Sequence, residues 1–379
     1  MTATPSERLR RLWLNIHLWI GAGLVLVLVP LSLSGAVLVW HEPLERALHP
    51  ERFAISGPGA VQPLSAYGRA AQAAFAGRAT LSQVRLPQHE GDPVTATGRL
   101  AGPPGPGGRP RNLTVWIDPP TARVLAAADT SQSFVQVMHR LHGTLLIPQV
   151  GRQVVGWLGV AMFVSSATGL WLWWPRNGAL LRALRWRRGA SKLFNLHHMA
   201  GFWICIPLAV LSLTGAYISF PQTARALFGG GAAPRAASPG GPGRFAPPLA
   251  KPTLGLDEAA AKALAERPGG RIVSVSAPTR GKAPAWRVQI ASPGVETPAT
   301  IQVVDATGQV KAGRGADAPD PNARLMRRIH DGTDMGGVWQ AIIFLGGIAP
   351  AVLGVSGIVM WLRRRARRRA VARRLPEAA

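Results

Sequence analysis

Four of the nine histidines recur at matched spacings, and these are the residues best suited to chemistry. His17 and His197 each lie 18 residues before a glycine (17 to 35 and 197 to 215). His142 and His330 each lie 27 residues before a glycine (142 to 169 and 330 to 357). Neutral imidazole is a common ligand of haem iron and of other transition metals. The matched spacings therefore suggest two bis-histidine sites, each with one ligand from either half of the chain.

The remaining histidines are less regular. His198 directly follows His197 and points about 100° away from it on a helix, so only one of the two can face a given haem. We expect His197, because it alone has a counterpart at the matched spacing. His139, one turn before His142, could reach the same site as its neighbour. Three further histidines have no counterpart in the second half and are expected at the surface: His41, His49 and His89.

Other interpretations of these residues stay open at this point. A histidine near a membrane surface commonly bonds to headgroups, and the set could instead serve metal transport or be inherited structural residues. Gly35 and Gly215, and Gly21 and Gly201 four residues past the inner histidines, could let a flat macrocycle approach the backbone. Close packing of helices explains such glycines equally well.

The elements that must position the histidines are four long apolar runs, at about 12–40, 150–174, 194–220 and 337–362. The first, from Trp13 through Trp40, rises about 42 Å as a helix, enough to cross a bilayer. The first and third runs match each other, as Leu31-Ser-Leu-Ser-Gly35 matches Leu211-Ser-Leu-Thr-Gly215. The second and fourth match likewise. The chain thus reads as a parallel duplication with two spans in each repeat.

Arginines predict the orientation of these spans. The N-terminus carries +2, the segment between the second and third runs +6, and the tail from Arg363 +7. Short cytoplasmic segments retain Lys and Arg, so both termini are expected inside and the two long segments outside. The formal net charge of +25 therefore indicates membrane topology and no nucleic-acid partner. The single cysteine, Cys205, excludes an internal disulfide.

The long outer segments each contain an alanine-rich helical stretch followed by alternating apolar residues typical of strands. Each unit alone has little core, so we expect the two to interlock as one domain. Two Gly/Pro-rich loops, Gly102–Arg111 and Gly229–Pro248, are expected to be disordered excursions. The expected division is 1–40 (N-terminus and first helix), 41–149 (first outer segment), 150–174 (second helix), 175–193 (basic cytoplasmic loop), 194–220 (third helix), 221–336 (second outer segment), 337–362 (fourth helix) and 363–379 (basic cytoplasmic tail).

The chain resembles the PepSY-associated transmembrane proteins, a family that includes inner-membrane ferric-siderophore reductases of Gram-negative bacteria. The resemblance covers nearly the whole chain and rests on a small set of motifs: Arg10-Arg11-Leu-Trp-Leu-Asn-Ile-His17, Leu33-Ser-Gly35, Met138-His-Arg-Leu-His142, Asn195-Leu-His197-His198, Gly215, Ile117-Asp118 and Val304-Asp305. It implies an α-helical membrane bundle of four transmembrane helices with a duplicated α+β, PepSY-like periplasmic domain. It further implies two b-type haems held by His17, His142, His330 and either His197 or His198.

The leading hypothesis is therefore a haem-dependent oxidoreductase of the bacterial inner membrane. It would pass electrons across the bilayer to a periplasmic ferric-siderophore or other iron complex. No G-x-G-x-x-G or flavin-type segment occurs in the short cytoplasmic pieces, so the electron donor is expected to be quinol or a cytoplasmic protein. A second hypothesis makes the outer segments a binding or regulatory module, anchored by helices without a cofactor. A small transporter ranks last, because ionisable residues lie only at the helix ends.

Overall fold

The structure of the chain is a computed structural model. It describes residues 4–59, 62–105, 108–175, 189, 191–228, 246–281, 283–295, 297–312 and 321–374. Most of the expected cytoplasmic loop 175–193, most of the Gly229–Pro248 loop and the last residues of the tail lie outside the described residues. The chain divides into a helical unit (Met1–His41, Val137–Gly230, Pro321–Ala379) and a sheet unit (Glu42–Gln136, Gly231–Asp320).

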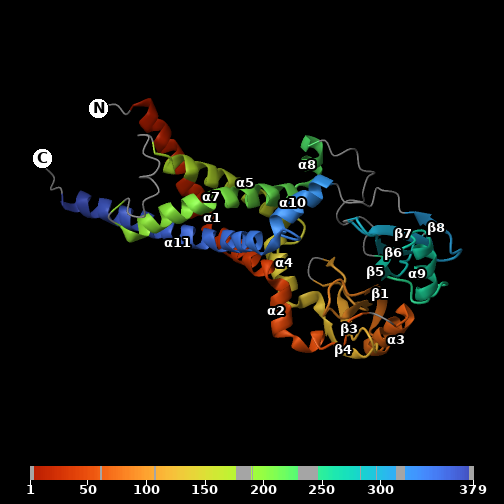
Figure 1. Cartoon of the computed structure of the whole chain (residues 1–379). Helices are drawn as coiled ribbons and strands as arrows, with labels where there is room; N and C mark the ends of the chain where they lie inside the picture. Colours follow the sequence, from red (N-terminus) through yellow and green to blue (C-terminus); the bar gives the residue numbers. More distant parts are fainter. Residues whose placement is uncertain are drawn as a thin grey trace. The chain divides into compact units, whose positions relative to one another are not determined.

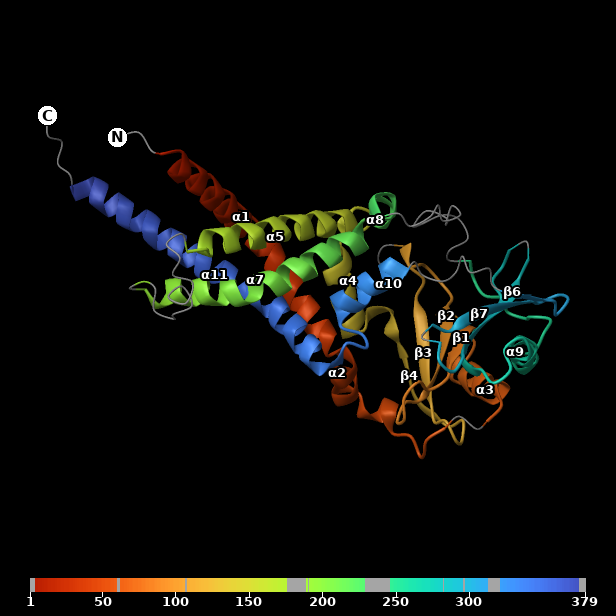
Figure 2. The same ribbon diagram turned by 45° about the horizontal axis from the view of Figure 1, so that its top comes forward.

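Four long helices dominate the helical unit: α1 (Pro5–Val39), α5 (Gly151–Trp173), α7 (Lys192–Ser219) and α11 (Gly336–Arg374). Each is long and apolar enough to cross a membrane. The expectation of four spans is thereby confirmed by length and composition. Both α1 and α7 pack against α5 and α11, as Figures 1 and 2 show. The sequence predicts such a bundle, because the apolar residues surround each helix and leave no polar face.

Two short helices precede α5 and α11 in the helical unit. They are α4 (Phe134–Thr144) and α10 (Pro321–Asp331), and each ends before the long helix that follows it (Figure 1). The turn after α4 contains Leu145 and Leu146 in the left-handed conformation, with φ of 51° and 58°. At Gly151, a Cβ would lie 2.0 Å from the Thr144 carbonyl oxygen, so only glycine fits there. The short helices are therefore separate elements joined to the long ones by tight turns.

The sheet unit contains one antiparallel sheet of eight strands in the order β4-β3-β2-β1-β5-β6-β7-β8. The strands are β1 (Ala79–Arg85), β2 (Val94–Leu100), β3 (Asn112–Ile117), β4 (Val124–Asp129), β5 (Arg271–Ser276), β6 (Ala285–Ala291), β7 (Ala299–Val304) and β8 (Val310–Ala312). Antiparallel pairing of β1 with β5, through Val84 opposite Val275, joins the two segments that were expected to lie outside. The two segments therefore share one sheet, as their small individual cores led us to expect.

Two helices cover this sheet and supply much of its core: α3 (Leu64–Phe75) on the first segment and α9 (Leu256–Ala265) on the second. Tyr67 and Phe75 of α3 and Ala259 of α9 are almost completely buried against strand residues such as Val115. The short helix α2 (His41–Leu48) and the 3-10 turns η1 (Pro50–Phe53) and η3 (Thr130–Gln132) complete the first segment. Apolar side chains on alternating strand positions thus face the helices.

Asp118 and Asp305 occupy equivalent places, directly after β3 and β7, and both are buried. Asp118 accepts hydrogen bonds from the Ser56 backbone N–H and hydroxyl, both at 2.7 Å, and from the Thr121 hydroxyl. Asp305 accepts from the backbone N–H groups of Thr253 and Leu254 and from the Trp286 indole. Each carboxylate therefore fastens the segment that leads into the helix of its half to the end of β3 or β7, the strands next to the two edges of the sheet.

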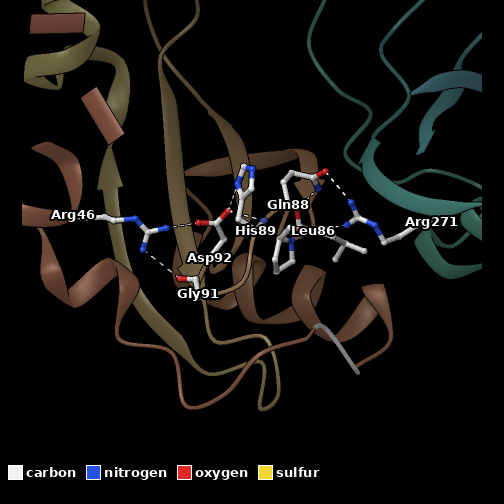
Figure 3. Close-up of polar contacts among 8 residues, drawn as sticks. Arg46, Leu86, Gln88, His89, Gly91, Asp92 and Arg271 are labelled. Carbon is white, nitrogen blue, oxygen red and sulfur yellow. Dashed lines mark hydrogen bonds and ion pairs between the residues drawn. The ribbon is translucent and has the colours of Figure 1, made fainter. Parts of the chain in front are cut away.

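The loop between β1 and β2 is held by polar contacts that Figure 3 shows in close-up. Asp92 pairs with Arg46 at 2.5 Å and with His89 at 3.3 Å, and the His89 side chain is 79% exposed. Arg271 reaches the same loop through the Pro87 carbonyl oxygen. His89 is thus a surface residue, as expected. His49 is also a surface residue, paired with Glu51 at 3.3 Å.

Candidate functional site

We call His17 and His197 the inner pair, and His142 and His330 the outer pair, after the sides that the arginines predict. The inner pair lies on two of the long helices. The ring centroids of His17 on α1 and His197 on α7 are 6.5 Å apart, with the ring planes at 88°. Neither ring is fully exposed. His198 turns to another side, where it stacks on Phe194 at 5.2 Å and contacts Trp173. The geometry thus pairs His17 with His197, and His198 joins a separate aromatic cluster.

The outer pair lies on the two short helices. The ring centroids of His142 on α4 and His330 on α10 are 5.9 Å apart, with the planes at 37°. His139, which could have reached the same site, instead lies with its ring centroid 6.0 Å from that of His41. His41 is partly exposed, in keeping with the expected surface position, but its ring packs against that of His139. Its side chain is packed because α4 passes beside the end of α1.

Each of the four paired histidines is held by a neighbouring helix through Nδ1. His17 Nδ1 lies 3.1 Å from the Ser165 carbonyl oxygen, and His142 Nδ1 lies 2.8 Å from that of Leu31. His330 Nδ1 lies 3.0 Å from the Leu211 carbonyl oxygen. Because a carbonyl oxygen can only accept, Nδ1 carries the proton in these three rings. In a neutral ring, Nε2 then has the lone pair that can bind a metal.

His197 reaches the same state through a hydroxyl. Its Nδ1 lies 2.8 Å from Ser356 Oγ, and this hydroxyl in turn donates to the Leu353 carbonyl oxygen at 3.1 Å. With its own proton committed to Leu353, the Ser356 oxygen accepts from His197. Nδ1 of His197 is therefore also the protonated nitrogen, and its Nε2 is left for a ligand.

Near each of the four histidines, a serine or threonine lies three residues after the leucine or serine whose carbonyl oxygen it contacts. Each of these hydroxyls donates to the carbonyl at 2.8 to 3.1 Å and is buried, and each residue directly precedes a glycine. The four residues are Ser34, Thr168, Thr214 and Ser356. The sequence analysis did not single them out, although a Ser or Thr directly before each matched glycine is a visible signal. Three of the four hydroxyls, those of Thr168, Thr214 and Ser356, also lie 2.8 to 3.2 Å from a histidine Nδ1, as outer-layer groups do around metal ligands.

The matched glycines make room for the imidazole rings. A Cβ on Gly35 would lie 2.7 Å from His142 Cε1, and one on Gly215 would lie 3.0 Å from His330 Cε1. The corresponding distances are 3.1 Å from Gly169 to His17 and 3.4 Å from Gly357 to His197. At Gly35 and Gly215 the ring of a histidine therefore occupies the place suggested for a macrocycle.

The other two glycines leave the macrocycle interpretation open. Among the described residues, no atom lies within 4 Å of an ideal Cβ on Gly21, and the nearest to Gly201 is Leu353 Cδ2 at 3.8 Å. The side of α1 at Gly21, one turn after His17, is thus open among the described residues. Within the described part of the chain, no cluster of three or more His, Cys, Asp or Glu side chains is arranged to hold a metal. Each histidine pair accordingly offers two protein ligands.

Comparison with known proteins agrees with this architecture. The model of the family described as "PepSY-associated TM region" matches residues 14–364, nearly the whole chain. No curated protein matches it. With four helices able to span a bilayer, the chain is a multi-pass membrane protein. It belongs to the family of PepSY-associated transmembrane proteins.

Proposed function

We propose that this protein is a di-haem reductase of the bacterial inner membrane, which passes electrons outward to a periplasmic ferric-siderophore or other iron complex. The observation that carries the proposal is the two histidine pairs: each Nδ1 bonds to a carbonyl or hydroxyl oxygen of a neighbouring helix, and each ring lies beside a matched glycine. Quinol or a cytoplasmic protein would supply the electrons on the side of the arginine-rich segments.

The ring separations suit two imidazoles that would hold one iron ion between them. Two imidazoles that bind one metal ion from opposite sides have ring centroids about 6 Å apart, since a metal–nitrogen bond is about 2 Å long. The observed separations are 6.5 Å for His17 with His197 and 5.9 Å for His142 with His330. A metal with two protein ligands needs its remaining ligands from elsewhere, and the four nitrogens of haem meet that need. When bound, haem iron supplies one-electron chemistry.

The distance between the two pairs along the helix axis suits electron transfer across a bilayer. His17 and Gly35, the residue that His142 contacts, are 18 residues apart on α1 (17 to 35). That spacing corresponds to about 27 Å along the helix, close to the roughly 30 Å of a hydrocarbon core. The protein's own contribution is to hold four neutral imidazoles, with their Nε2 lone pairs available, near opposite leaflets. Arginine asymmetry supports an inner location for His17 and an outer one for His142.

An absorption spectrum of the purified full chain, followed by a pyridine haemochrome assay, tests the cofactors. We expect b-type haem at about two per chain, low-spin because two imidazoles would hold each iron. In proteoliposomes, a quinol or dithionite supplied on one side should then reduce a ferric complex on the other. A protein that binds no haem when expressed with an adequate haem supply would instead favour the cofactor-free anchored module.

A further inference from the structure

A third pair of histidines lies beside the outer pair and is not used by the proposed function. The ring centroids of His41 and His139 are 6.0 Å apart, between the values of the other two pairs, with the planes at 69°. His41 Nδ1 lies 2.8 Å from the Leu38 carbonyl oxygen, so it donates its proton there and leaves Nε2 with a lone pair. The local arrangement thus resembles that of His142, whose Nδ1 also donates to a carbonyl of α1.

The match between the two halves of the sequence does not account for this pair. The position equivalent to His139 is Arg327, three residues before His330, and the position equivalent to His41 is Pro221. Neither replacement can bind a metal ion as a neutral nitrogen ligand. The pair therefore belongs to one half only, and it is a separate feature from the two pairs related by the matched spacings.

His41 and His139 are also more accessible to solvent than two side chains that meet in a protein core. His41 is partly exposed and His139 is exposed, and His41 is the first residue of α2, just after α1 ends at Val39. An edge-to-face contact of two rings contributes only about 0.5–1.5 kcal/mol and does not require histidine. Two imidazoles at this separation with a solvent-accessible edge do, however, suit an exchangeable metal ion whose other ligands are water.

We propose that His41 and His139 form a binding site for a divalent late transition-metal ion, with Cu²⁺ bound most tightly. Imidazole suits Cu²⁺, Ni²⁺ and Zn²⁺, and affinities among these ions are highest for Cu²⁺. Two neutral nitrogen ligands carry no charge to hold alkaline-earth ions, which prefer oxygen. The site does not depend on haem, and because His139 lies one turn before His142, the ion would bind next to the outer pair.

Binding of Cu²⁺ to the purified full chain tests this proposal, with a purification tag that contains no histidine. Competition with a copper chelator should show about one Cu²⁺ per chain, and His41→Ala or His139→Ala should each weaken binding about tenfold or more. Matched control variants are His49→Ala and His89→Ala, which remove exposed histidines and should leave the affinity unchanged. Equal copper affinity in the wild type, His41→Ala and His139→Ala would overturn the proposal.

A spectroscopic measurement avoids reliance on variants that could fail to fold. Pulsed EPR of the copper-loaded protein detects the remote nitrogen of each coordinated imidazole. In the His49→Ala/His89→Ala double variant, we expect two coordinated imidazoles per Cu²⁺. A spectrum with none or one would contradict the assignment of His41 and His139 as joint ligands, even if copper binds.

Discussion

The inner and outer histidine pairs both bond through Nδ1 to a neighbouring helix, but they belong to helices of very different length. His17 and His197 belong to helices of 35 and 28 residues, whose positions are determined by the whole bundle. His142 and His330 belong to helices of 11 residues each. Tight turns and a few contacts hold these short helices, such as the bond from the Trp339 indole to the Ile329 carbonyl oxygen at 2.9 Å. The outer pair should therefore be the easier one to disturb.

The glycine contacts point in the same direction. A Cβ would meet the histidine ring at 2.7 and 3.0 Å in the outer pair but at 3.1 and 3.4 Å in the inner pair. The outer rings are thus pressed more closely onto the helix backbone that receives them. A site made by docking short helices needs this close contact, whereas a site made by long helices is positioned by packing along their full length.

The largest effects should come from the histidines themselves, and they separate the two pairs. His17→Ala or His197→Ala should remove the inner haem and leave the outer one, so the content falls from about two per chain to about one. His142→Ala or His330→Ala should have the converse effect. Pyridine haemochrome assays give the content, and redox titration shows which component is lost.

His198→Ala is the matched control for His197→Ala, because the two residues are adjacent and His198 packs on Phe194 instead. It should retain both haems. If His17→Ala and His142→Ala both kept the full haem content, neither pair would bind haem.

The next largest effect should come from filling the glycine contacts. Gly35→Ala places a methyl group 2.7 Å from His142 Cε1, so the ring or α4 must move. Overpacking of this kind typically costs about 1–3 kcal/mol. Gly357→Ala places its methyl at an ordinary contact distance of 3.4 Å from His197 Cε1 and should be tolerated. We expect loss of the outer haem in the first variant and normal content in the second; equal loss in both would show that the two pairs are equally constrained.

A smaller effect is expected from the hydroxyls. Ser356→Ala removes the group that accepts the Nδ1 proton of His197, whereas Ser34→Ala leaves the Leu31 carbonyl in place for His142. Loss of an outer-shell partner typically weakens metal binding about 10- to 100-fold. Rates of haem transfer to apomyoglobin should therefore rise for the inner haem in Ser356→Ala and change little in Ser34→Ala. A larger change in Ser34→Ala would mean that its hydroxyl, and not the carbonyl, orients His142.

The sequence predicted which histidines lie together, because residues at equivalent depths of matched helices must meet across a bundle. Their role as haem ligands stays a prediction. The sequence did not reveal that His142 and His330 lie on helices of their own, since the break after α4 depends on Leu145 and Leu146 in a conformation that leucine rarely adopts. It also missed the pairing of His41 with His139, which has no matched spacing and arises only when α4 docks beside the end of α1.

The same limit applied to the sheet unit. Alternating apolar residues predicted its strands, and the small cores predicted that the two segments would join. No local pattern could show that Asp118 binds Ser56, because the partners are 62 residues apart in the chain and meet only in the folded sheet. Ile117-Asp118 and Val304-Asp305 were visible as matching motifs, but their function as acceptors of backbone N–H groups needed the structure.

The smallest effect on the histidine pairs should come from the sheet unit, through Asp305. Burial alone would raise the pKa of Asp305, but the hydrogen bonds from Thr253, Leu254 and Trp286 outweigh it and hold the pKa below the usual 3.8. A carboxyl whose pKa is lowered by folding stabilises the fold above its unfolded pKa of about 3.9 and loses that contribution as the pH falls through the folded value.

Asp305→Asn should cost about 1–3 kcal/mol at neutral pH, because an amide accepts fewer hydrogen bonds than a carboxylate. Hydrogen exchange of the β7 amides, corrected for intrinsic rates, should show weaker protection in this variant at pH 7 and a smaller loss on acidification below about pH 4 than in the wild type. Both haems should be retained at pH 7, since all four of their proposed ligands lie in the helical unit. Selective loss of the outer haem in Asp305→Asn would instead show that the short helices α4 and α10 depend on the sheet for their position.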